Sequence, residues 1–243
     1  TQLQEEMSQT SSKREPNMVD REHEVDNRMP QVELNIPSRI SQGSSVNNRT
    51  TDGALVFIDD DTRTQLYELI FPLAVRRNIP ITSAAITGRI GVNPNTITID
   101  QFREMRDSGL VEFVSHTHNH LHLDELSPNQ IRNEILDSLK WLRREGVYTD
   151  HLVYPFGRIN GTIRQIAQEC GIKSASKSNG LNMRVQNDVP DMMNLPRVNF
   201  EEPLDTIKNR IDSCKENREV CIINIHSQFD TYSVAKHETI IDY

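Results

Sequence analysis

The sequence is poor in aromatic residues and cysteine, and it contains no long apolar run. No stretch of its 243 residues approaches the roughly 18 consecutive apolar residues that cross a bilayer, so we expect no membrane span. The three cysteines, Cys170, Cys214 and Cys221, cannot all pair within one chain, and their spacings match no zinc ribbon. We expect them to be buried thiols.

Basic residues are also fewer than acidic residues. The chain has 27 Lys and Arg residues against 35 Asp and Glu residues, which gives a formal net charge of -8 at pH 7. An acidic surface repels phosphate backbones and anionic lipids. The charge balance therefore argues against a nucleic acid or a membrane surface as the partner.

Aromatic residues are missing altogether from the first part of the chain, where Phe57 is the first. Residues 1–50 are polar and mixed in charge, and they cannot bury enough apolar surface to offset the entropy of ordering. We predict an irregular polar N-terminal arm there, either a disordered tether or a segment ordered by a partner in a larger assembly. The chain starts at Thr1 with no signal-peptide pattern, so we expect a processed or shortened chain.

Residues 51–243 are expected to form one folded domain in which strands alternate with helices. Short apolar runs predict strands, and apolar residues at helical spacing predict helices. The expected strands are 54–58, 79–86, 110–115, 151–157, 172–178, 195–200 and 219–226, and the expected helices are 62–78, 98–109, 127–146, 161–171 and 203–217.

This alternation predicts an α/β fold with parallel strands joined by right-handed crossovers. The number of repeats favours a (β/α) barrel over an open sheet. No glycine-rich phosphate loop follows the first strand, which argues against a nucleotide-binding sheet. In such a barrel, functional residues gather where the strands end at their C-terminal edge.

The expected strand ends carry an unusual set of polar residues. The first strand ends in three acids and the third in a cluster of histidines at alternate positions. The fourth ends in Tyr-Pro-Phe-Gly and the last in a histidine. These residues are Asp59, Asp60, Asp61, His116, His118, His120, His122, Tyr154, Pro155, Phe156, Gly157 and His226.

The histidine cluster has two interpretations. Two neutral imidazoles and a carboxylate form a three-ligand site for a divalent ion, usually zinc, with one position left open. If the chain turns helical after Ser115, His116 and His120 share a face, and the LDELSP segment after His122, which leads into a helix, favours this turn. Alternatively, the histidines are solvated side chains of a polar loop. The acidic strand end nearby favours metal binding.

Four motifs, in this order and spacing, resemble those of the polysaccharide deacetylases, which share the nodulation-deacetylase homology domain of carbohydrate esterases. They are "FIDDD", "SHTHNHLHL", "YPFG" and "IINIH", and the resemblance covers about residues 54–230. The family pattern of His-Ser/Thr-x-x-His with a Leu three residues later is matched by His116, Thr117, His120 and Leu123. The resemblance implies a deformed (β/α) barrel.

The resemblance also implies roles for individual residues. Asp60, His116 and His120 would bind the metal ion, most simply Zn²⁺. Asp59 would be the general base that deprotonates the attacking water, and His226 would protonate the departing amine.

The remaining roles concern the YPFG motif and the acids. The backbone N–H of Phe156 would stabilise the oxyanion, with Tyr154 and Pro155 beside it at the substrate. Asp59 and Asp61 have an alternative role as caps of the following helix, and Asp61 is the one expected to act so.

Three departures from the family pattern affect these roles. Asp61 stands where the family usually has Gly, so the register of the three acids is open by one position. Val153 stands where the family commonly has an Arg that orients the base. Arg197 could supply that charge from a later strand, or it could form an ordinary surface ion pair. Phe156 replaces the usual Tyr, which keeps the backbone donor.

The resemblance implies a metal-dependent hydrolase that removes N-acetyl groups from an N-acetylhexosamine polysaccharide outside the cytoplasm. Peptidoglycan, chitin-like chains and exopolysaccharide remain open as substrates, as does an O-acetyl ester. One alternative is an inactive carbohydrate-binding or assembly module of a larger envelope or virion structure. A metallo-β-lactamase pattern, His-x-His-x-Asp-His, fails because His120 and Leu121 occupy its last two positions.

Overall fold

The computed structural model describes residues 53–178, 183–184 and 191–243. The predicted arm over residues 1–50, with its possible partner, lies outside these ranges.

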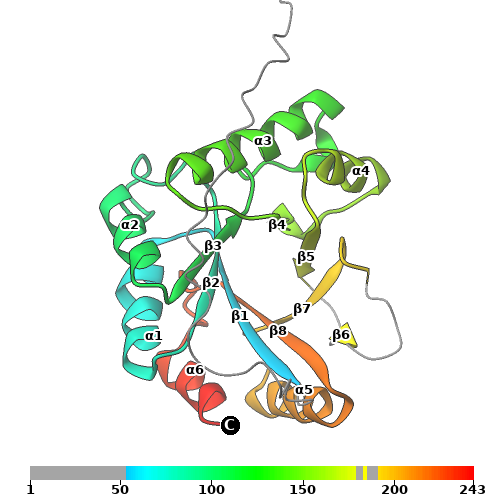
Figure 1. The fold of residues 1–243 in the computed structure, drawn as a ribbon. Helices are drawn as coiled ribbons and strands as arrows, with labels where there is room; N and C mark the ends of the chain where they lie inside the picture. The colour runs from blue at the N-terminus through cyan, green and yellow to red at the C-terminus, as the bar shows by residue number, and fades with distance from the viewer. Residues whose placement is uncertain (1–52, 179–182, 185–190) are drawn as a thin grey trace, which may run out of the picture. The chain divides into compact units, whose positions relative to one another are not determined.

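Within the described residues, seven parallel strands close into a barrel (Figure 1). They are β1 (Ala54–Asp60), β2 (Ile81–Ala85), β3 (Val111–Ser115), β4 (His151–Val153), β5 (Ser174–Ser178), β7 (Leu195–Asn199) and β8 (Glu219–Ile225). Strand β1 pairs with both β2 and β8, which closes the ring. A short strand, β6 (Met183–Arg184), pairs antiparallel with β8. The predicted α/β barrel is confirmed.

The barrel is irregular where β3 meets β4. These strands are paired at Ser115 and Leu152, whereas β1 and β8 are paired at six successive positions from Ala54–Val220 to Asp59–Ile225. Strand β4 is only three residues long because Pro155 follows it closely, and proline cannot donate a ladder hydrogen bond. The barrel is therefore deformed, as predicted.

Helices cover the outside of the barrel (Figure 1). They are a π-helical turn, η1 (Leu66–Ile70), α1 (Phe71–Arg77), α2 (Ile99–Asp107), a 3₁₀ turn, η2 (Leu123–Glu125), α3 (Pro128–Arg144), a 3₁₀ turn, η3 (Pro155–Gly157), α4 (Gly161–Glu169), α5 (Leu204–Asn217) and α6 (Val234–Ile241). Helix α2 starts at a capping box between Thr98 and Gln101, and left-handed Gly109 follows its end.

Alternation along the strands separates an inner from an outer face. One apolar residue from each of six strands lines the barrel interior: Ile58, Ala84, Val114, Val153, Leu195 and Ile222. Phe57, Phe113 and Ile223, next to three of these, belong to the apolar cluster that packs against the outer helices. Strands β1 and β8 are thus buried on both faces over most of their length, which explains their continuous apolar sequences.

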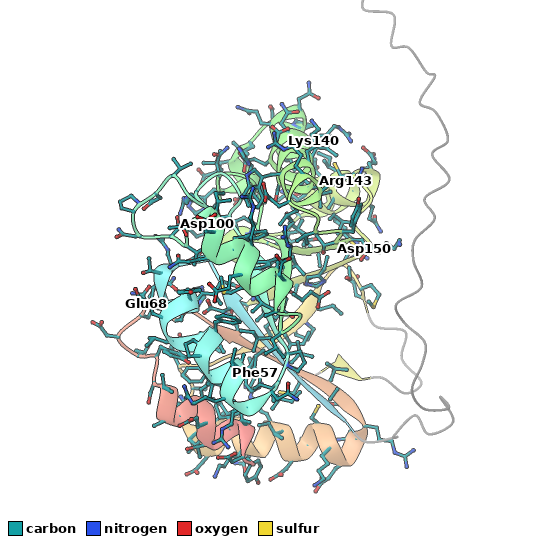
Figure 2. The ribbon with its side chains drawn as sticks, turned by 60° about the vertical axis from the view of Figure 1, so that its left-hand side comes forward. Phe57, Glu68, Asp100, Lys140, Arg143 and Asp150 are labelled. Atoms are coloured by element: carbon teal, nitrogen blue, oxygen red, sulfur yellow. The ribbon has the colours of Figure 1, made fainter. Side chains whose placement is uncertain are left out.

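Charged residues occupy the solvent side of the helices. Glu68, Asp100, Lys140 and Arg143 are exposed on η1, α2 and α3 (Figure 2). No helix in the described part of the chain is long and apolar enough to cross a membrane.

Candidate active site

The inner face of the barrel changes from apolar to polar at the carboxyl ends of the strands. Asp60 lies two residues after inward-facing Ile58 on β1, and Arg197 lies two residues after Leu195 on β7. The same two-residue step leads from Val114 to His116 after β3. Strand alternation therefore directs these three side chains toward the inside of the barrel, and their positions place them at the end where the strands terminate.

Asp60 and Arg197 form a buried bidentate ion pair. Arg197 Nη1 donates to Asp60 Oδ1 at 2.8 Å, and Nη2 donates to Oδ2 at 2.9 Å. Burial acts to raise the pKa of Asp60, but the charges of Arg197 and its neighbours outweigh it and hold the pKa below the ordinary value. His226 lies on the same carboxylate, with Nε2 3.8 Å from Oδ2. Asp60 is therefore an ionised carboxylate between a fixed cation and an imidazole.

Asp61 lies beside the two imidazoles. Its Oδ1 is 3.6 Å from His120 Nε2 and 3.8 Å from His116 Nε2, and the two Nε2 atoms are 3.1 Å apart. Asp61 Oδ2 accepts a hydrogen bond from the side chain of Gln228 at 2.7 Å, which orients the carboxylate.

These three residues have the donor set of a divalent-metal site. His116 Nδ1 lies 2.8 Å from the carbonyl oxygen of Val153, so Nδ1 carries the proton and Nε2 presents a lone pair toward Asp61 and His120. Burial, together with the neighbouring His116, lowers the pKa of His120 to about 3, so this imidazole is neutral at pH 7. Two imidazoles and one carboxylate fit zinc, with room for a further ligand.

The structure places the acids one position away from the predicted arrangement. Asp60, predicted as a metal ligand, has both carboxylate oxygens on Arg197. Asp61, predicted as a helix cap, instead faces the imidazoles, and η1 begins after Gln65 without a side-chain cap. The physical reason is the backbone of Asp61, which has φ of 81° directly after β1. Because this residue is not extended, its side chain does not follow the alternation of the strand and reaches the imidazoles instead.

Asp59, predicted as the general base, points away from the inner face. Its Oδ1 accepts from the backbone N–H of Ser227 at 2.9 Å, and its Oδ2 from the Ser227 hydroxyl at 3.1 Å. Burial raises the pKa of Asp59 well above its ordinary value despite these hydrogen bonds. This placement fits an anchor for the segment after β8 rather than a base.

The histidine segment is a loop rather than the predicted helical turn. Thr117 and His120 have positive φ of 65° and 60°, and the chain from His116 to His122 contains no helix. Buried Glu134 of α3 fixes the loop by accepting the backbone N–H of Asn119 at 2.8 Å and its side-chain amide at 2.7 Å. His116 and His120 still meet, but through two left-handed residues.

The YPFG segment is divided between core and rim. Tyr154 is fully buried and its hydroxyl donates to the carbonyl of Met193 at 3.0 Å, while Pro155 is also buried. This buried position does not fit the prediction that the Tyr154 side chain contacts the substrate. Phe156 is 52% exposed at the rim, with a left-handed backbone (φ 58°).

Sequence reasoning missed three residues that hold the site: Glu134, Ser227 and Gln228. A signal existed for Glu134, because it falls on the apolar stripe of α3 formed by Ile131, Ile135 and Leu142. Ser227 and Gln228 follow His226 directly, but nothing in their residue type distinguishes them from ordinary loop residues.

Two groups of residues with different chemical properties lie next to each other at this rim of the barrel. One is a three-donor site for a divalent cation, and the other is an ionised carboxylate beside a histidine. Such a pair can polarise a carbonyl group and transfer protons to and from it. The fold and this site define an α/β-barrel protein with a candidate hydrolytic metal centre.

Comparison with known proteins agrees with this class. The family model for polysaccharide deacetylases matches residues 47–175, and the chain belongs to this family. A poly-β-1,6-N-acetyl-D-glucosamine N-deacetylase of Staphylococcus aureus is 28% identical over 127 residues, which are 47% of this chain and 44% of that protein. The chain thus spans less than half the length of that relative.

Solved structures show the same fold. The Streptococcus pyogenes deacetylase PplD, in complex with acetate, is 27% identical with a TM-score of 0.54, over 59% of this chain and 62% of that one. A family 4 carbohydrate esterase from Streptomyces lividans, also with acetate, matches 78% of this chain and 86% of its own. Its TM-score is 0.54 at 16% identity, so it supports the fold alone.

Proposed function

We propose that this protein is a metal-dependent deacetylase that removes N-acetyl groups from an N-acetylhexosamine polysaccharide. The observation that carries the proposal is the Asp61, His116 and His120 donor set beside the Asp60–Arg197 pair. Family membership and the printed substrate of the Staphylococcus aureus relative support a glycan amide as the target. Such a polymer lies outside the cytoplasm, and we propose that the protein acts there.

Asp61, His116 and His120 would hold the ion, for which zinc is the simplest candidate given two imidazoles and one carboxylate. When bound, the ion would polarise the acetyl carbonyl and make an attacking water more acidic.

Asp60 is the general base in this proposal. The guanidinium of Arg197 keeps it ionised in a buried place, so it is ready to accept a proton from the attacking water. Arg197 therefore supplies, from β7, the charge expected at the position of Val153.

His226 and Phe156 complete the proposed site. His226, whose Nε2 is 3.8 Å from Asp60, would donate a proton to the departing amine, so the product leaves neutral. The backbone N–H of Phe156, at the rim after β4, would stabilise the negative oxygen that forms on the acetyl carbon.

The three consecutive acids offer a matched test. Asp59→Asn, Asp60→Asn and Asp61→Asn each exchange one carboxylate for an amide of the same size. Each purified variant is assayed for bound metal and for acetate release from β-1,6- and β-1,4-linked N-acetylglucosamine oligomers and from peptidoglycan.

We expect Asp60→Asn to lose acetate release while retaining metal, and Asp61→Asn to lose both. Asp59→Asn should keep both, because Asp59 is hydrogen-bonded to Ser227 rather than to the imidazoles or Arg197. Loss of turnover in Asp59→Asn with full activity in Asp60→Asn would reverse these roles. Absence of metal and of acetate release in the unmodified protein would favour a binding module.

A further inference from the structure

Two half-exposed phenylalanines lie across the barrel mouth from each other. Phe156 follows β4 and is 52% exposed, and Phe229 follows β8 and is 50% exposed. In the ring order β1-β2-β3-β4-β5-β7-β8, two strands separate β4 from β8 in one direction and three in the other. The two rings therefore follow strands from opposite sides of the barrel, Phe156 next to His120 and Phe229 next to His226.

Each ring stacks on a histidine of this rim. The Phe156 ring is nearly parallel to His122, with centroids 3.8 Å apart and an angle of 14° between the planes. The Phe229 ring lies against His226 in the same way, at 4.9 Å and 12°. The Phe156 ring also lies against His120, with centroids 4.5 Å apart and an angle of 49° between the planes. The imidazoles therefore hold each ring in place, and about half of each side chain stays exposed.

Core packing does not account for this arrangement. Both side chains are among the large apolar residues that remain exposed, whereas Tyr154 and Pro155 beside Phe156 are buried. Phe156 also has a left-handed backbone, which is unfavourable for a bulky residue, and Gly157 after it has φ of 65°. Strain and exposed apolar surface together at a site rim indicate a binding role.

We propose that Phe156 and Phe229 bind the sugar rings on either side of the N-acetylhexosamine that is deacetylated. A pyranose ring has flat faces of C–H groups and a rim of hydroxyl groups, so a flat aromatic ring covers the former and leaves the latter hydrated. The site then takes at least three successive sugars and acts within a chain rather than on a free sugar. This inference rests on the proposed function and deepens it.

The test uses N-acetylglucosamine oligomers from the single sugar to the hexamer, in β-1,4- and β-1,6-linked series. Phe156→Leu and Phe229→Leu keep apolar bulk but remove the flat ring. In the unmodified protein we expect kcat/KM to rise from the single sugar to the hexamer. In each variant this rise should be about 3- to 10-fold smaller, since an aromatic stack contributes that much to binding. Tyr148→Ala removes a 72% exposed aromatic residue that lies three residues before β4, toward the other end of the barrel, and should keep the rise.

A purely structural role of Phe229 predicts a different dependence of the rate on chain length. If Phe229 only held His226 in place, Phe229→Leu would lower kcat equally for every chain length, and such a result would overturn the inference. Unchanged chain-length dependence in both variants would overturn it as well, while leaving the deacetylase activity intact.

Binding separates this inference from the proposed function. Calorimetry with each hexamer uses Asp60→Asn protein, which is expected not to turn the oligomer over, with and without the two Leu substitutions. Binding that depends on both rings supports the inference even if no acetate is released by the unmodified protein. Failure of Asp60→Asn protein to bind either hexamer overturns it.

Discussion

Arg197 is the residue that keeps Asp60, the proposed base, ionised. It is 1% exposed, and besides Asp60 it contacts the Ser178 hydroxyl, with Nη2 at 3.4 Å. A carboxylate at this depth is costly unless a cation pairs with it, and a bidentate guanidinium provides both charge and geometry. The cation comes from β7 because β7 shares with β1 the inner face of the barrel.

We predict that Arg197→Met destabilises the protein by about 3 to 5 kcal/mol, because it leaves Asp60 buried without its cation. The pKa of Asp60 should rise, so the acidic limb of the pH–activity profile moves to higher pH. Urea unfolding and pH–rate measurements check both. In Asp60→Asn/Arg197→Met both charges are gone and much of the stability should return; a loss equal to the sum of the single variants would contradict the pairing.

The register of the three acids shows how far sequence reasoning reaches at this scale. The sequence correctly indicated that the acids and the paired histidines lie at the carboxyl ends of two strands, β1 and β3, which are separated by β2 in the barrel. Alternation could not tell which acid faces inward, because β1 is apolar on both faces. The left-handed turn at Asp61, which brings it to the imidazoles, has no signal in a residue type such as aspartate.

At the scale of elements, α3 and the histidine loop form one unit. Glu134 lies on the buried stripe of α3 and receives both donors of Asn119, three residues beyond His116 in the loop. The helix therefore sets the loop conformation that brings His116 and His120 together. The sequence predicted α3 with its start and end, but the helical turn expected after Ser115 was wrong.

We predict that Glu134→Ala lowers zinc affinity by about 10- to 100-fold, the range typical of outer residues that orient ligands. Competition with a coloured chelator measures the affinity. Asp137→Ala, an exposed acid one turn further along the same helix, is the matched control and should leave affinity unchanged. Equal affinity in the two variants would show that the loop holds its shape without α3.

At the scale of the whole molecule, the strands and helices that close the barrel could be predicted from the sequence. Apolar runs gave the strands, capping residues gave the helix starts, and alternation of the two gave the parallel barrel. Helix α6 (Val234–Ile241) follows β8. It places His237 against the Phe57 ring of β1, with centroids 4.5 Å apart, so the end of the chain packs on its first strand.

His237 links this packing to pH. It is fully buried, and its Nδ1 lies 3.1 Å from the hydroxyl of Tyr232. Burial lowers the pKa of His237 to about 4 from 6.5 in the unfolded chain. Between these values the unfolded chain binds the proton and the folded protein does not, so stability is full above pH 6.5 and falls toward pH 4.

We predict that His237→Phe reduces this acid-induced loss of stability by an amount on the order of 3 kcal/mol. Unfolding by urea, with chelator present so that bound metal does not contribute, is compared between pH 7.5 and pH 4.5. His151, whose pKa burial also lowers to about 4, titrates in both proteins and cancels from the comparison. The unpaired Tyr232 hydroxyl should lower the variant's stability equally at all pH values. The slope with pH is therefore diagnostic, and equal slopes in the two proteins would mean that His237 is protonated without disturbing α6.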